Sequence, residues 1–144
     1  MSGAIVITNL DDVLRDLGHT EKQIDFAAKY AIGITGAAVE RQAKLNANTG
    51  THKVGEPRIS GGIGPNVVTG NLRRSIFSRT RIGFGTYIAE VGATMEYARQ
   101  VEQGGGRWKS GVKYPYIAPA AEKLRDNGTL SRTFAGAFAS QLRG

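Results

Sequence analysis

The longest regular pattern of hydrophobic positions lies in residues 21–47. Thr20 followed by Gln23 forms a capping box, and no proline interrupts the segment after it. Gly33 and Gly36 would let a neighbouring element approach the backbone closely. We therefore predict one long amphipathic helix that lies across a sheet. Its predicted apolar face consists of Ile24, Ala27, Ala28, Ala31, Ile32, Ile34, Ala38, Val39 and Leu45.

Alternating positions in residues 75–82 and 86–93 predict an antiparallel hairpin. One side of the hairpin would face the long helix, and the other side mixes charge with apolar area. That second side is either a solvated face or part of an interface. The expected cross-strand pairs are Ile82 with Tyr87, Thr80 with Ala89, Ser78 with Val91, and Arg79 with Glu90.

The remaining pattern predicts shorter elements around this core. They are a strand at residues 4–7, a small helix after Asn9 that stops at Gly18, a long mobile loop at 48–68, a helical turn at 70–74, and helices at 95–103, 119–126 and 130–142. The last helix carries Leu130, Phe134, Phe138 and Leu142 in one stripe, as a core or subunit contact would. The prediction is a single α+β domain over residues 1–144: a long N-terminal helix on a small antiparallel sheet, with short C-terminal helices and long mobile loops.

The composition makes several classes of function unexpected for this chain. The chain has 144 residues, a net charge of +7 and no cysteine, and its two histidines make a poor metal pair. No grouping of nucleophile and base is visible, so we expect no enzyme activity, no cofactor and no metal. No apolar run approaches the roughly 18 residues of a membrane span, so we expect no membrane partner.

The positive charge is concentrated in residues 73–113, which hold eight basic and three acidic side chains. A basic surface attracts phosphate backbones and acidic protein surfaces alike, so both partner classes stay open at this point. Within this region the predicted interface residues are Arg73, Arg74, Arg79, Arg81, Glu102, Arg107, Trp108 and Lys109.

Glu102 is unusual because it lies in the last turn of a predicted helix, where the helix dipole disfavours a carboxylate. We expect a basic partner for it, either Arg107 or Lys109 of the following loop or an arginine of another subunit. Trp108 lies between these two cations and has the composition of an interface anchor. The alternative is that the tryptophan folds back onto its own sheet.

Three signatures follow the long helix in order: TGNLRRSI at residues 69–76, YARQVEQG at 97–104 and PYIAPA at 115–120. This arrangement resembles the neck, or head-to-tail joining, family of tailed bacteriophages. The residues that carry the resemblance are Thr69, Gly70, Leu72, Arg73, Ser75, Tyr97, Ala98, Glu102, Gly104, Pro115, Pro119 and Ala120. Two departures are the further glycines after Gly104 and the long loop before Thr69.

The resemblance implies a structural virion protein that forms a neck or tail-completion ring between the head connector and the tail tube. It implies these partners: further copies of the chain, with a hexamer expected, a head-closure protein, and a tail terminator or tube protein. Viral DNA would pass through the lumen without specific binding, and assembly would take place in the host bacterial cytoplasm. The alternative from another class is a basic nucleic-acid-binding domain, although no recognition-helix or RNA-binding signature is present.

Overall fold

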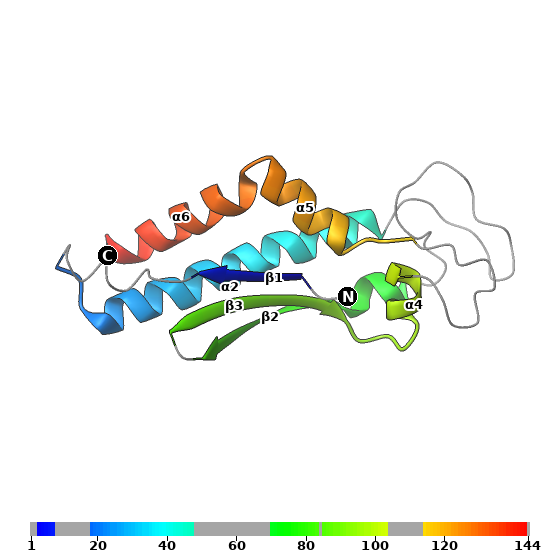
Figure 1. Cartoon of the computed structure of the whole chain (residues 1–144), viewed down its shortest axis with the longest axis horizontal. Coiled ribbons are helices and arrows are strands. Elements are labelled where there is room, and N and C mark those ends of the chain that lie inside the picture. The colour runs from blue at the N-terminus through cyan, green and yellow to red at the C-terminus, as the bar shows by residue number, and fades with distance from the viewer. Residues whose placement is uncertain (1–2, 8–17, 48–69, 84, 104–113, 144) are drawn as a thin grey trace, which may run out of the picture.

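A long central helix separates a three-stranded sheet from two C-terminal helices (Figure 1). The computed structural model describes residues 3–7, 18–47, 70–83, 85–103 and 114–143. The elements are β1 (Gly3–Ile7), α2 (Glu21–Asn46), α3 (Asn71–Ser75), β2 (Ile76–Gly83), β3 (Thr86–Ala93), α4 (Ala98–Gln103), α5 (Ala118–Asp126) and α6 (Thr129–Leu142). This arrangement confirms the predicted α+β fold.

The N-terminus of α2 is fixed by the predicted capping box. The backbone N–H of Gln23 donates to the Thr20 hydroxyl at 3.3 Å, and the Thr20 N–H donates to the Gln23 side chain at 3.0 Å. The predicted apolar face was wrong at two positions, because Ile34 and Leu45 are 41% and 59% exposed. They lie beyond the arc that the sheet and the C-terminal helices cover. The buried face is Ile24, Ala27, Ala28, Ala31, Ile32, Thr35, Gly36, Val39 and Ala43.

The sheet has the strand order β1-β3-β2, and both pairings are antiparallel. All four cross-strand pairs expected for the hairpin are present, although β2 begins at Ile76, one residue later than predicted. The predicted strand near the N-terminus is present as well, and it pairs with β3. Thr80 and Ile82 are exposed, so α2 covers only the first part of β2 on this side.

The close approach of α2 to the sheet occurs at Gly36. A Cβ atom built at this position would lie 2.9 Å from the Cβ of Ala89 and 3.6 Å from that of Ser78. At Gly33, the nearest atom would be the Thr80 hydroxyl oxygen at 3.6 Å. The expectation of a close helix contact is therefore confirmed, and Gly36 is the residue that requires it.

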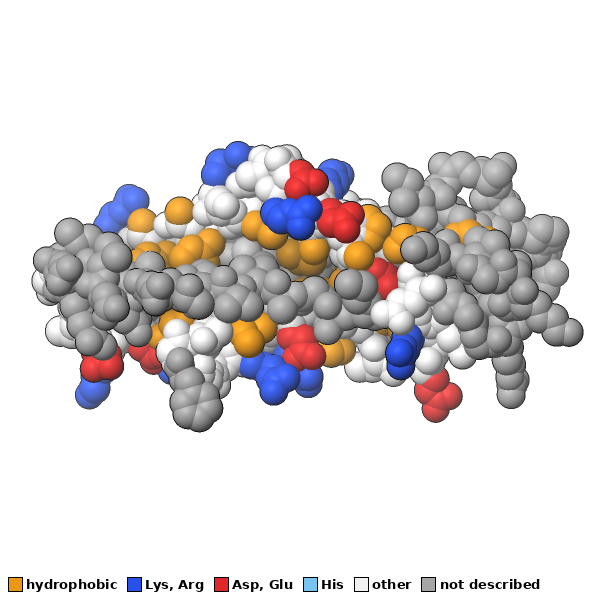
Figure 2. Space-filling view, viewed as in Figure 1, with side chains coloured by type: hydrophobic (Ala, Val, Ile, Leu, Met, Phe, Trp, Pro, Cys, Tyr) orange, Lys and Arg blue, Asp and Glu red, His pale blue; other side chains and the backbone are white. Residues whose placement is uncertain are grey.

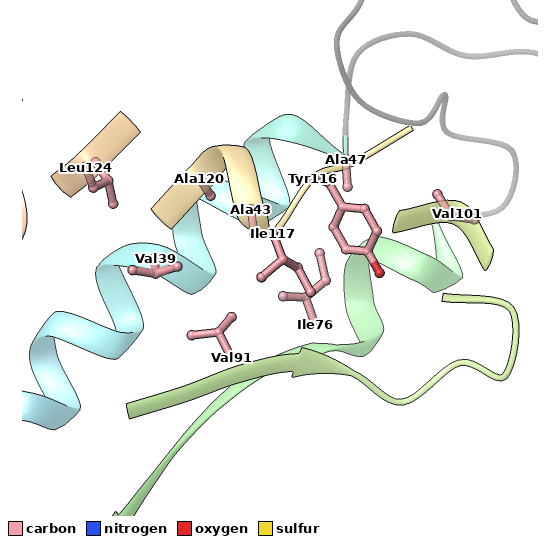
Figure 3. Close-up of a cluster of buried hydrophobic side chains, with 10 residues drawn as sticks. All are labelled: Val39, Ala43, Ala47, Ile76, Val91, Val101, Tyr116, Ile117, Ala120 and Leu124. Atoms are coloured by element: carbon pink, nitrogen blue, oxygen red, sulfur yellow. The ribbon is translucent and has the colours of Figure 1, made fainter. Parts of the chain in front are cut away.

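Two apolar clusters lie along α2. The first joins the C-terminal half of α2 to the sheet, α4 and the start of α5, and Figure 3 shows its side chains converging. The second joins the N-terminal half to Tyr87, Ala89 and Phe138. Phe134 stacks on Phe138 with ring centroids 5.7 Å apart, so the predicted stripe of α6 is a core contact. Each end of α2 thus has its own packing partners.

Several expectations are revised or lie outside the described residues. Helix α4 begins at Ala98, not at residue 95, and Tyr97 just before it is 37% exposed. The helix expected after Asn9 and the loop of residues 48–68 lie outside the part of the chain that the structure describes.

The contact at Gly36 gives a matched pair of substitutions. Gly36→Ala should lower the free energy of unfolding by about 1–3 kcal/mol, because its methyl group would force the helix away from Ala89. A methyl group at Gly33 would meet the Thr80 hydroxyl oxygen only at an ordinary contact distance of 3.6 Å, so Gly33→Ala should raise stability by up to ~1 kcal/mol through helix propensity. Urea unfolding followed by circular dichroism measures both. Equal effects of the two substitutions would contradict the close approach.

Candidate interaction surface

Glu102 is buried, with 3% of its surface exposed, and its carboxylate caps the N-terminus of α5. Oε2 accepts hydrogen bonds from the backbone N–H groups of Tyr116 at 2.7 Å and Ile117 at 3.1 Å, and Oε1 accepts one from Ala118 at 2.8 Å. The first N–H groups of a helix have no partner within the helix, and the dipole makes this end favourable for an anion. The Glu102 carboxylate provides both the hydrogen-bond acceptors that these N–H groups lack and the negative charge that this end of the helix favours.

Among the described residues, the partners of Glu102 are backbone amides and not a basic side chain; Arg107 and Lys109 lie outside the described residues. Glu102 lies at the unfavourable end of α4, as the sequence indicated, but the favourable end of α5 lies against it. The sequence indicated only charged side chains as compensation. The described contacts of Glu102 place it within the monomer core, where it joins α4 to the segment before α5.

The ring of Tyr116 is completely buried beside this cap. Among the described residues its hydroxyl has no hydrogen-bond partner. Burial, then the Glu102 carboxylate, then Tyr97 raise the pKa of Tyr116 well above the ordinary value of a phenol. The hydroxyl therefore stays protonated at physiological pH.

Figure 2 shows basic and acidic side chains along the lower side of the molecule, where Figure 1 places β2 and β3, and ion pairs on the outer face of the sheet account for part of them. Arg79 donates to Glu90 at 2.9 Å, and Arg81 lies 3.7 Å from the same carboxylate oxygen. The Arg79 guanidinium also lies 5.6 Å from the centre of the Phe77 ring. The hydrogen bond from Arg79 lowers the pKa of Glu90. Arg79 and Arg81, two of the predicted interface residues, thus share the carboxylate of Glu90.

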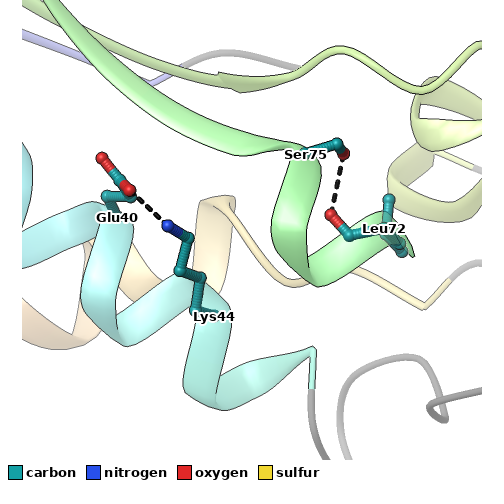
Figure 4. A network of polar contacts seen from close by, with 4 residues as sticks. All are labelled: Glu40, Lys44, Leu72 and Ser75. Carbon is teal, nitrogen blue, oxygen red and sulfur yellow. Dashed lines mark hydrogen bonds and ion pairs between the residues drawn. The ribbon is translucent and has the colours of Figure 1, made fainter. Parts of the chain in front are cut away.

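A groove of about 500 Å³ lies between α2 and α3, and we call it the α2–α3 groove. It is lined by Ala37, Glu40, Arg41, Lys44, Leu45 and Arg73. Figure 4 shows the Glu40–Lys44 ion pair on the turns of α2 that lie beside α3. Burial alone would raise the pKa of Glu40, but hydrogen bonds from Lys44 and Ser78 lower it below its ordinary value. Glu40 is therefore ionised and already paired.

The outward side of α2 carries a row of apolar side chains that the sequence analysis did not identify as a surface. Phe26 is 60% exposed, Tyr30 42%, Ile34 41% and Leu45 59%, and we call these four residues the α2 outer stripe. The steps between positions 26, 30 and 34 are four residues, which places them on one side of a helix. The same four-residue spacing is visible in the sequence, where it could have indicated a second apolar face on α2. Leu45 belongs to both the stripe and the groove.

The predicted interface residues do not form one patch. Arg73 lines the α2–α3 groove, Arg74 donates to Asn71, Arg79 and Arg81 share Glu90 on the sheet, and Glu102 is buried. Arg107, Trp108 and Lys109 lie outside the described residues. A continuous basic stripe, which nucleic-acid binding favours, is not formed by the described arginines.

No group of three or more His, Asp or Glu side chains that could hold a metal ion occurs in the described ranges. Within the same ranges, no helix has the length and apolar character that crossing a membrane requires.

Comparison with protein families gives one match, over residues 11–104, to the family described as "Bacteriophage HK97-gp10, putative tail-component". The chain belongs to the HK97-gp10-like family. The match covers more than half of the chain, from before α2 to just after α4, and so includes the hairpin and Glu102. Members of this family are structural components of the phage tail, so the chain is a structural phage protein of the virion. Comparison with curated proteins and with solved structures found no match.

Because Glu102 caps α5, its substitution should destabilise the isolated protein. Glu102→Gln should lower its free energy of unfolding by about 1–3 kcal/mol, because a neutral amide presents one acceptor oxygen where the carboxylate presents two. Glu122→Gln, at an exposed position of α5, is the control and should have little effect. Thermal melts of both variants measure this. An unchanged melting temperature for Glu102→Gln would rule out the cap as a stabilising contact.

The pKa of Glu40 predicts how stability depends on pH. A carboxyl group whose pKa is lower in the folded state stabilises the fold above its unfolded value, here 4.5, and this contribution is lost as the pH falls through the folded pKa. Unfolding free energy should therefore decline below about pH 4.5. Glu40→Gln should be less stable at neutral pH and should decline less steeply. Denaturant melts at a series of pH values test this; identical slopes for both proteins would contradict it.

Proposed function

We propose that this protein is a neck or tail-completion ring subunit that joins the head connector to the tail tube of a tailed bacteriophage. The observation that carries the proposal is membership of the HK97-gp10-like family of tail components. The motifs at residues 69–76, 97–104 and 115–120 support the joining role by resemblance. The whole chain, residues 1–144, would act as one domain without enzymatic chemistry.

The arrangement of surfaces supports this role. A subunit of a closed ring contacts a neighbour on each side through two different patches, and it also meets unlike proteins above and below. The described residues provide two candidate surfaces for such contacts: the arginine cluster on the outer face of the sheet, and the α2 outer stripe together with the adjoining α2–α3 groove.

The proposed partners are further copies of the chain in a ring, with a hexamer expected by resemblance, a head-closure protein, and a tail terminator or tube protein. Viral DNA would pass through the lumen without specific binding, and assembly would take place in the host bacterial cytoplasm. Arg107, Trp108 and Lys109 stay proposed interface residues, together with Arg73, Arg74, Arg79 and Arg81.

A phage with this gene deleted tests the proposal. We expect DNA-filled heads and separate tails in place of whole particles, because the joint between them is missing. Electron microscopy of lysates counts the three species, and the wild-type gene supplied on a plasmid should restore joined particles. Normal numbers of joined particles without the gene would refute the joining role.

The isolated protein should be monomeric or weakly associated, because ordering several contacts at once favours assembly on a template. Light scattering at micromolar concentration measures its mass. A stable closed ring without partners would contradict this expectation and leave the joining role in place.

A further inference from the structure

Within the described residues, part of the positive charge in the α2–α3 groove has no acidic partner. Lys44 is paired with Glu40, but no hydrogen bond or ion pair joins Arg41 or Arg73 to any residue in the described ranges. Both arginines are exposed at the edge of the groove. By contrast, Arg79 and Arg81 on the sheet share a carboxylate. The groove is therefore a place where an added acidic group would gain two new charged partners.

Apolar surface continues directly from this charge. Leu45 lines the groove and is 59% exposed, and Ala37, which also lines the groove, is exposed as well. Steps of three or four residues connect Leu45 through Arg41, Ala37 and Ile34 to the rest of the α2 outer stripe. The row from position 26 to position 45 is about 28 Å long at 1.5 Å per residue. One extended face thus combines apolar area with unpaired cations at one end.

We infer that this face binds an acidic segment of another virion protein, with carboxylates at Arg41 and Arg73 and apolar side chains against Leu45 and the α2 outer stripe. The inference rests on the proposed function, since it takes the partner from the same particle. Charge complementarity selects the partner: the groove has three cations and one anion. Apolar area next to arginine side chains is a usual composition of a protein-binding site.

Two other occupants fit the groove less well. A DNA backbone would leave Leu45 and the stripe without apolar contacts, and its phosphates would approach the ionised Glu40. A second copy of the chain carries a net charge of +7, so its surface is on average repelled by the unpaired arginines. An acidic protein segment satisfies both the charge and the apolar area.

Photo-crosslinking identifies the occupant directly. The complementing gene is supplied with p-benzoyl-phenylalanine at position 45, and joined particles are irradiated, purified and digested for mass spectrometry. The same probe at position 131, an exposed residue of α6, is the control. We expect position 45 to crosslink to a different virion protein, within a peptide that has more Asp and Glu than Lys and Arg. A crosslink to DNA, to another copy of this chain, or no crosslink in particles that contain the protein would overturn the inference.

Charge reversal tests the arginines separately. Arg41→Glu and Arg73→Glu, made singly, should each reduce the crosslink and the number of joined particles by about tenfold, the effect of losing one charge-assisted contact. Lys123→Glu changes the net charge equally at an exposed position of α5 and should reduce neither. Melting curves identify any variant that fails to fold; Arg41, in the middle of a long helix, is the safer site. Full particle yield from both folded variants would overturn the inference, whereas absence of the wild-type protein from particles would refute the proposed function itself.

Discussion

The close contact between Gly36 of α2 and Ala89 of β3 is the constraint on which the arrangement of the fold depends. It brings the backbone of α2 against β3, the middle strand of the sheet, where a methyl group at position 36 would already be too close to Ala89. The two apolar clusters then form on either side of this point, one toward each end of α2. Because the helix lies so close to the sheet and to the C-terminal helices, only its outward side stays exposed.

The C-terminal helices depend on a second, polar contact. Glu102 replaces the missing hydrogen-bond partners at the start of α5, and Asn46 at the end of α2 donates to the carbonyl of Tyr116 in the same segment at 3.0 Å. The hydrogen bonds of Glu102 and Asn46 together hold the chain where it enters α5, next to the larger apolar cluster. A buried carboxylate is costly unless its oxygens are satisfied, and here both accept hydrogen bonds from the backbone. Its burial is therefore compatible with a stable core.

Two sites on the described surface differ in how far their positive charge is compensated by acidic side chains. On the sheet, Arg79 and Arg81 are held by Glu90, so their charge is largely compensated. In the α2–α3 groove, Arg41 and Arg73 are unpaired among the described residues and lie next to apolar side chains. A structural phage protein needs contacts that are directional, and unpaired arginines beside apolar area provide both direction and contact area. The inferred acidic partner follows from this difference.

The sequence by itself determined the elements whose causes are local. The capping box at Thr20 fixed the start of α2, and alternation fixed the register of the hairpin down to the Arg79–Glu90 pair. The signatures at residues 69–76, 97–104 and 115–120 indicated a family of phage tail proteins, and the family match over residues 11–104 includes the first two. The tertiary structure alone decided which face of α2 is covered, because Ile34 and Leu45 are as apolar as their buried neighbours and differ only in what packs against them. It also decided the partner of Glu102, since the amides that satisfy it come from residues 116–118, and only folding brings that segment to the end of α4.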